Sequence, residues 1–130
     1  VCSHDYAAAR GIPGTVSALA LHRLLLRNAE RSHSWGDLLA VAGLDLASLA
    51  DTRVLGNSFA LLEGVRAGLG ITLLPRYLVA EQIAIGRLVE VPLADAKPAA
   101  TDFYLSYYPS VTARLWSAVL LDCLATADAV

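Results

Sequence analysis

Apolar and polar positions follow their most regular pattern between residues 52 and 91. Apolar runs of strand length are separated there by segments in which apolar side chains recur every three or four residues, as on one face of a helix. This order predicts an α/β fold whose parallel strands are joined by right-handed crossovers. The predicted strands are residues 52–55, 71–74 and 87–91, and the predicted helices lie between Ser58 and Gly68 and between Pro75 and Gly86.

Weaker patterns on either side of this region predict further short elements. Hydroxyl side chains mark several helix starts, because they accept hydrogen bonds from the first free N–H groups, and glycine marks helix ends. The expected strands are residues 22–27 and 103–108, and the expected helices run from a Ser3 cap to residue 10, from a Thr15 cap to residue 20, from a Ser34 cap to residue 42 with Gly43 as the stop, and from a Ser110 cap to about residue 125.

Composition indicates a globular chain. Of the 130 residues, 56% are hydrophobic, and 23 alanines and 24 leucines make up more than a third of the sequence. A disordered chain is excluded, because such chains bury too little apolar surface to offset their ordering entropy. The length fits one domain with its own core. A formal net charge of −2 argues against a free-standing nucleic-acid binder, which normally carries a basic surplus.

The chain contains no methionine, and its mean hydropathy of +0.54 is high for a small complete domain. We therefore expect a piece of a longer protein, with some apolar surface that faces further parts or partners. No apolar stretch approaches the roughly 20 residues of a membrane-spanning helix, and no export signal opens the chain. Cys2 and Cys123 are expected as reduced thiols of a cytoplasmic protein without membrane contact.

Several motifs resemble catalytic or cofactor sites but lack a necessary partner. Ser58 lies in a Gly-Asn-Ser-Phe-Ala turn like a hydrolase nucleophile elbow, yet no histidine follows it in the chain to act as a base. Gly68 and Gly70 precede a predicted strand, whereas the glycines of a dinucleotide fingerprint follow one. The segment Cys2-Ser3-His4-Asp5 has metal-ligating side chains but no second ligand cluster. We expect no enzyme activity, no metal and no cofactor.

One feature suited to binding remains at the start of the helix near residue 58. Asn57, Ser58 and Phe59 follow a predicted strand and begin a helix. Free backbone N–H groups and the positive end of the helix dipole favour an anion there, and ligands of open α/β sheets bind beyond the carboxyl ends of the strands. Asn57 and Ser58 could equally cap the helix without any ligand, so both roles stay open.

The same region resembles the effector-binding domain of LysR-type transcriptional regulators. The resemblance is most specific in residues 57–75, which have the sequence NSFALLEGVRAGLGITLLP, a helix followed by Gly-x-Gly, a strand and a proline. It covers nearly the whole chain. The other matching segments are residues 1–6 (VCSHDY), 11–13 (GIP), Leu19 with His22, 77–78 (YL), 86–89 (GRLV), 103–109 (FYLSYYP) and the final helix.

The resemblance implies a fold like that of type 2 periplasmic binding proteins, in which two α/β subdomains are joined by two crossover strands. Residues 1–88 would form the second subdomain, a Rossmann-like half with a mainly parallel sheet flanked by helices. Residues 89–130 would complete the returning crossover (87–93) and add a terminal strand and helix of the first subdomain. The N-terminal helix-turn-helix and most of the first subdomain would be missing.

The resemblance also implies a small-molecule effector, with anions among the candidates, bound in the cleft between the subdomains. Ser3, Asn57 and Ser58 would hydrogen-bond this effector, and Phe59 would form an apolar wall. The protein would be a homodimer or tetramer that contacts DNA only through the missing N-terminal domain, and the effector would change the geometry of this oligomer. A solute-binding protein of the same fold and a ligand-free dimerisation module are the alternatives.

Overall fold

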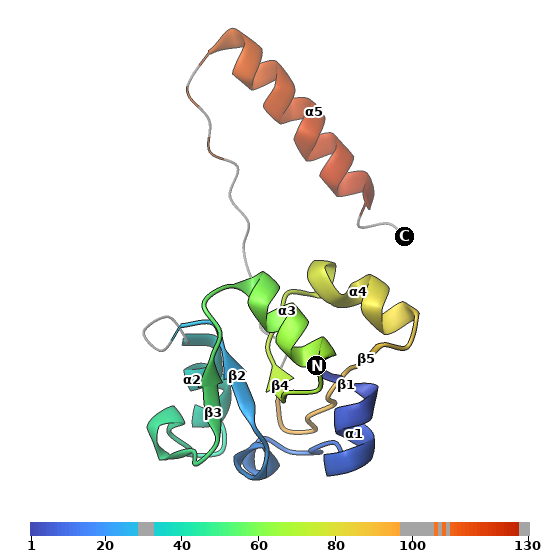
Figure 1. Cartoon of the computed structure of the whole chain (residues 1–130). Coiled ribbons are helices and arrows are strands. Elements are labelled where there is room, and N and C mark those ends of the chain that lie inside the picture. The colour runs from blue at the N-terminus through green and yellow to red at the C-terminus, as the bar shows by residue number, and fades with distance from the viewer. Residues whose placement is uncertain (29–32, 97–105, 107, 109, 128–130) are drawn as a thin grey trace. The chain divides into compact units, whose positions relative to one another are not determined.

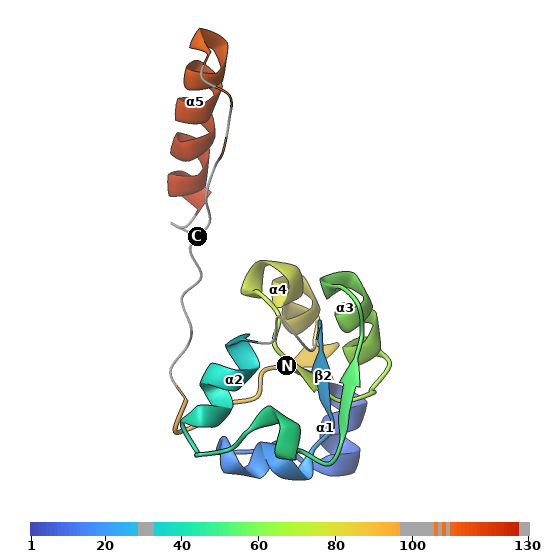
Figure 2. The same cartoon turned by 90° about the vertical axis from the view of Figure 1, so that its left-hand side faces the viewer.

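The computed structural model describes residues 1–28, 33–96, 106, 108 and 110–127. The chain divides into two compact units, Val1–Pro98 and Ala99–Val130. Figures 1 and 2 show the helices and small sheets of the first unit and the long helix of the second. The elements of the first unit are β1 (Cys2–Ser3), α1 (His4–Arg10), the 3₁₀ helix η1 (Ser17–Leu21), β2 (Leu24–Leu26), α2 (His33–Ala40), the 3₁₀ helix η3 (Leu46–Ser48), β3 (Thr52–Val54), α3 (Ser58–Arg66), β4 (Ile71–Thr72), α4 (Arg76–Ala84) and β5 (Leu88–Val89).

A parallel three-stranded sheet with the order β3-β2-β4 forms the centre of the first unit. In its register, Leu24 of β2 is opposite Thr52 of β3 and Ile71 of β4. All three leucines of β2 are buried, as expected for a central strand of a parallel sheet that has both faces covered. The parallel sheet and its flanking helices confirm the α/β fold class predicted from the alternating pattern.

The strand β5 does not join this parallel sheet, so the prediction that residues 87–91 form another of its parallel strands was wrong. β5 pairs antiparallel with β1 in a separate two-stranded sheet, in which Ser3 is opposite Leu88. Val1 already occupies the outer edge of β4. The N–H of Thr72 donates to the carbonyl of Val1, and the amino group of Val1 donates to the carbonyl of Thr72. Since β1 begins at this edge, β5 finds its partner in β1 instead.

The core lies between the sheet and its helices. In α3, Leu61, Gly64 and Val65 are buried. A Cβ atom on Gly64 would lie 2.6 Å from Cδ1 of Leu55, so the absence of a side chain lets the helix approach the sheet closely. The buried apolar residues of this cluster are Cys2, Tyr6, Val16, Leu19, Leu24, Leu25, Leu26, Trp35, Leu39, Leu61, Val65, Ile71, Val79 and Leu88.

Most of the helix ends predicted from local signals are confirmed. The hydroxyl of Ser3 caps α1 by accepting a hydrogen bond from the N–H of Tyr6 at 3.1 Å. Of the two proposed caps of α3, Asn57 is the one that occurs, since its Oδ1 accepts from the N–H of Ala60 at 2.9 Å. Gly43, beyond the end of α2, has the left-handed φ of +67° that the stop signal requires.

Three predicted helix starts were wrong. The segment expected as a helix with a Thr15 cap is the 3₁₀ helix η1, whose cap position is Val16. The helix α2 begins at His33, so Ser34 belongs to the helix and is not its cap. Pro75 is the cap position of α4 and not a residue of its first turn, because its ψ of 141° is extended. A proline suits this position as well, since the cap contributes no N–H to the helix.

The second unit contains α5 (Val111–Ala127), which confirms the predicted last helix. The Ser110 hydroxyl accepts from the N–H of Ala113 at 3.0 Å, as expected of its cap. The predicted strand at 103–108 lies outside the described residues, apart from Ser106 and Tyr108, which belong to no strand. Within the described parts of the chain, α5 included, no helix combines the length and apolar character that crossing a bilayer requires.

Candidate functional site

The start of α3 lies at the carboxyl edge of the parallel sheet. The N–H of Leu55 donates to the carbonyl of Leu26 at 2.7 Å and continues the pairing of β3 with β2 by one residue. The chain then turns at Gly56 and enters α3 at Ser58. This turn exposes Asn57, leaves Ser58 half-buried and leaves 73% of the Phe59 side chain accessible to solvent. The structure therefore brings three of the predicted site residues together.

The backbone at this helix start can hold an anion. The N–H groups of Ser58 and Phe59 have no hydrogen-bond acceptor among the described residues, whereas the N–H of Ala60 is used by the Asn57 cap. Free N–H groups in the first turn coincide with the positive end of the helix dipole. An oxyanion can therefore accept two backbone hydrogen bonds here, and the exposed ring of Phe59 offers an apolar surface beside it.

Ser3 lies elsewhere in the unit. It is 4% exposed, and a Cβ atom on Gly68 would lie 3.4 Å from its hydroxyl oxygen. Gly68 follows the last turn of α3, and a nine-residue helix is about 14 Å long at 1.5 Å per residue. Ser3 is thus near the opposite end of α3 from Asn57, so the structure does not bring all four predicted residues together.

Position in the sheet points to residues at the carboxyl edge that the sequence analysis did not assign to the candidate site. Arg76 and Tyr77 begin α4 directly beyond β4, just as Ser58 begins α3 beyond β3. Both side chains are largely exposed, and a guanidinium nitrogen of Arg76 lies 3.6 Å from a carboxylate oxygen of Glu90. With β2 between them, β3 and β4 are about 10 Å apart at the usual strand spacing. One sequence signal could have identified Arg76 and Tyr77: like Ser58, they follow a predicted strand.

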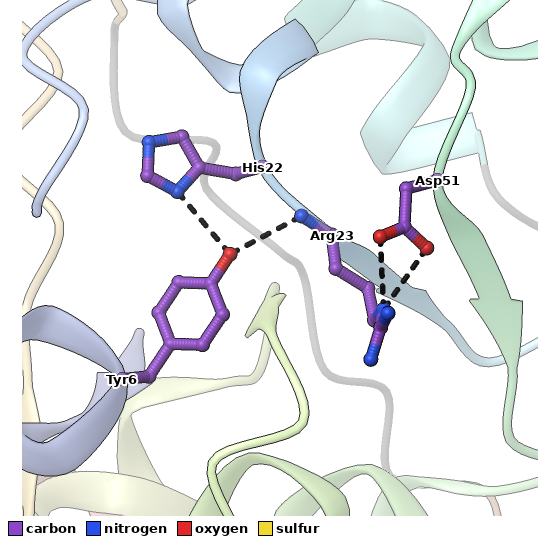
Figure 3. A network of polar contacts seen from close by, with 4 residues as sticks. All are labelled: Tyr6, His22, Arg23 and Asp51. Carbon is purple, nitrogen blue, oxygen red and sulfur yellow. Dashed lines mark hydrogen bonds and ion pairs between the residues drawn. The ribbon is translucent and has the colours of Figure 1, made fainter. Parts of the chain in front are cut away.

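A second group of polar side chains lies at the amino edge of the sheet (Figure 3). Arg23 directly precedes β2, and Asp51 directly precedes β3. Nε of Arg23 donates to both carboxylate oxygens of Asp51, at 2.9 and 3.0 Å. This bond, together with the positive charge, holds the pKa of Asp51 below its usual range. The Tyr6 hydroxyl from α1 accepts from the N–H of Arg23 and lies 3.2 Å from Nδ1 of His22.

Burial disfavours Cys2 as a reactive thiol. It raises the pKa of this thiol, so the nucleophilic thiolate is less accessible. Cys123 is exposed on α5. Among the described residues there is no group of three or more histidine, cysteine, aspartate or glutamate side chains placed to hold a metal ion.

Comparison with known families identifies the chain. The family described as "LysR substrate binding domain" matches residues 1–128. The chain belongs to this family. Its match over almost the full length confirms the resemblance seen in residues 57–75. The search of curated proteins found no match.

A solved structure is also similar to this LysR substrate-binding domain. It is the regulatory domain of CrgA, a LysR-type transcriptional regulator from Neisseria meningitidis, with 28% sequence identity and a TM-score of 0.47. The match covers 65% of this chain and 41% of the CrgA chain, so the aligned part spans less than half of that domain.

As in other LysR substrate-binding domains, the fold is an α/β fold like that of type 2 periplasmic binding proteins, with the parallel sheet β3-β2-β4 flanked by helices. The division into subdomains at 1–88 and 89–130 stays a prediction. The boundary between the two compact units falls between Pro98 and Ala99.

Proposed function

We propose that this chain is the effector-sensing part of a LysR-type DNA-binding transcriptional regulator. The observation that supports this function is the start of α3. It combines two free backbone N–H groups, a hydroxyl and an exposed aromatic ring at the carboxyl edge of a parallel sheet, in a chain of the LysR substrate-binding family. A small metabolite with a carboxylate or another oxyanion fits these groups.

Each residue at the helix start has a distinct role in this proposal. Ser58 donates its hydroxyl and its backbone N–H to the oxyanion, and Phe59 packs against the carbon skeleton of the effector. Asn57 holds the first turn in place through its bond to the N–H of Ala60, while its amide nitrogen is free to donate to the ligand. Ser3 would act from the other end of α3, so a ligand long enough to reach both ends is needed to engage it.

The effector would work by changing how two subdomains meet. Bound at the carboxyl edge, it contacts the first turn of α3 and a facing subdomain together and stabilises the arrangement in which both contacts exist. In a homodimer or tetramer that angle sets the spacing of DNA-binding domains, which an N-terminal part of the full-length protein supplies. The site of action is the cytoplasm, where such a regulator meets its DNA.

Two experiments test this proposal. In the native gene, the sequence upstream of the Val1 codon should encode a basic helix-turn-helix and a second α/β half. A start codon within a few codons would contradict the proposal, and an export signal would favour a solute-binding protein instead.

In the full-length protein, Ser58→Ala should weaken the response to the effector while the fold is retained. Ser17→Ala, which changes an exposed serine of η1, is the matched control. An unchanged response in Ser58→Ala would show that the start of α3 is not the effector site; the ligand-free dimerisation module also predicts that this substitution has no effect.

A further inference from the structure

A hollow of about 270 Å³ opens at the amino edge of the parallel sheet. It lies between α1, the residues that precede β2 and β3, and the turn that joins α3 to β4. The side chains and backbone around it include Asp5, Tyr6, Arg10, Arg23, Asp51 and Leu69. The start of α3 is at the carboxyl edge, so it and this hollow are at opposite ends of the same strands.

One side of this hollow can receive a carboxylate. Asp51 holds the Arg23 side chain through Nε alone, and the terminal nitrogens of this guanidinium make no hydrogen bond to the described residues. Such a fixed guanidinium can donate two parallel bonds to a carboxylate. Arg10, in the last turn of α1, adds a second positive charge to the lining. The charge of Asp51 is therefore outweighed by those of Arg10 and Arg23.

The lining also contains groups that suit an ammonium group. Asp5 contributes an exposed carboxylate that forms no ion pair with the described residues. Ala67 and Gly68 bring the C-terminal end of α3 to the same hollow, and this end carries the negative pole of the helix dipole. Arg66 of the last turn is paired with Glu63, which offsets its positive charge. Ala9 and Leu69, of which the second is 44% exposed, provide apolar surface.

We propose that this hollow binds a small zwitterion, an α-amino acid with an aliphatic side chain, whose carboxylate pairs with Arg23 and Arg10 and whose ammonium group pairs with Asp5. A purely anionic ligand would face Asp5 and the end of α3 unpaired, and a purely cationic ligand would face the arginines. Only a molecule with both charges pairs with both kinds of group. The site is independent of the effector site at the start of α3.

Calorimetric titration of the 130-residue chain with three matched probes tests this proposal. L-leucine carries both charges, 4-methylpentanoate lacks the ammonium group, and 3-methylbutylamine lacks the carboxylate. Saturable binding of L-leucine at least about tenfold tighter than that of either analogue is expected, since each analogue leaves one set of charges unpaired. Equal binding of 4-methylpentanoate, or no saturable binding of L-leucine up to about 10 mM, the weak end of small-ligand affinities, would overturn the proposal.

Four variants locate the site. Arg10→Gln and Asp5→Asn remove charges from exposed side chains and should each weaken L-leucine binding several-fold. Arg76→Gln, which removes an exposed guanidinium at the other edge of the sheet, should leave it unchanged. Ser58→Ala should also leave it unchanged, because Ser58 belongs to the effector site. Loss of L-leucine binding in Ser58→Ala but not in Arg10→Gln would place the amino acid in the effector site and refute the second site.

Discussion

The hydroxyl oxygen of Tyr6 accepts a hydrogen bond from the backbone N–H of Arg23, with 3.2 Å between the two atoms. Tyr6 is on α1 and Arg23 directly precedes β2, so this bond fastens the first helix to the amino edge of the central strand. The same hydroxyl lies 3.2 Å from Nδ1 of His22. Because its oxygen already accepts from Arg23, its proton can be donated to Nδ1 of a neutral His22.

Tyr6→Phe should lower the free energy of unfolding by about 1–2 kcal/mol, because it leaves the N–H of Arg23 and Nδ1 of His22 without their partner while the ring is kept. Urea unfolding followed by circular dichroism measures this change. Tyr108→Phe is the control, since 93% of that side chain is exposed and its loss should cost less than about 0.5 kcal/mol. Equal effects of the two substitutions would contradict the role of the Tyr6 hydroxyl.

Stability should decrease as the pH falls below about 6.5, the usual pKa of histidine. Burial, and to a smaller extent the charge of Arg10, lower the pKa of His22 in the folded chain. The unfolded chain therefore binds a proton more readily than the folded one, so His22 contributes stability above pH 6.5 that is lost as the pH falls through its lower folded pKa. The free energy of unfolding should be measured between pH 5 and 8 for the chain and for His22→Gln. Its slope against pH should be shallower for the variant. Parallel slopes would exclude His22 as the source.

Gly70→Ala should destabilise the chain by about 1–3 kcal/mol or more, the usual cost of overpacking. A Cβ atom on Gly70 would lie 2.5 Å from the carbonyl oxygen of Arg23, and this oxygen accepts the N–H of Ile71, so backbone would have to move. Gly36→Ala is the contrasting variant. Gly36 lies inside α2, and a Cβ atom on it would meet nothing within 4 Å. It should stabilise the helix by about 0.5–1 kcal/mol. Thermal unfolding of both variants decides the sign of each effect.

Asn57 allows the cap of α3 to be separated from ligand binding. Asn57→Ala removes the acceptor of the Ala60 N–H and should cost about 1 kcal/mol of stability. Asn57→Asp keeps a cap of similar strength and should be nearly neutral for stability, but its negative charge should repel an anionic effector. Thermal unfolding, together with the effector response of the full-length protein, distinguishes the two variants. An undiminished response in Asn57→Asp would argue against an anion at this helix start.

Local chemistry made much of this fold predictable. The caps Ser3, Asn57 and Ser110 depend on a side chain and an N–H only three residues away, so the sequence pattern contains the whole interaction. The pairing of β5 with β1 depends on residues more than 80 positions apart, and no local pattern encodes it. The same holds for the ion pair of Arg23 with Asp51, 28 residues apart, and thus for the hollow at the amino edge.

The separation of Ser3 from the start of α3 has a similar cause. Ser3 was placed in the candidate site by family resemblance, whereas Asn57, Ser58 and Phe59 were placed by the rule that ligands bind beyond the carboxyl ends of parallel strands. That rule could be applied because these three residues follow a strand of the parallel sheet. Ser3 ends a strand of the antiparallel pair instead, so the position of its hydroxyl depends on how β1 packs beside the last turn of α3.

The antiparallel pair of β1 and β5 has a mechanical consequence. Cys2 is opposite Val89, so force applied through these two residues would separate the strands from that end and load their few hydrogen bonds one after another. The two strands do not carry such a load alone. Val1 exchanges two backbone hydrogen bonds with Thr72 of β4, and beyond β5 the N–H of Ala94 donates to the carbonyl of Gly14. A pull on both ends of the first unit would therefore have to break these bonds before it separates β1 from β5.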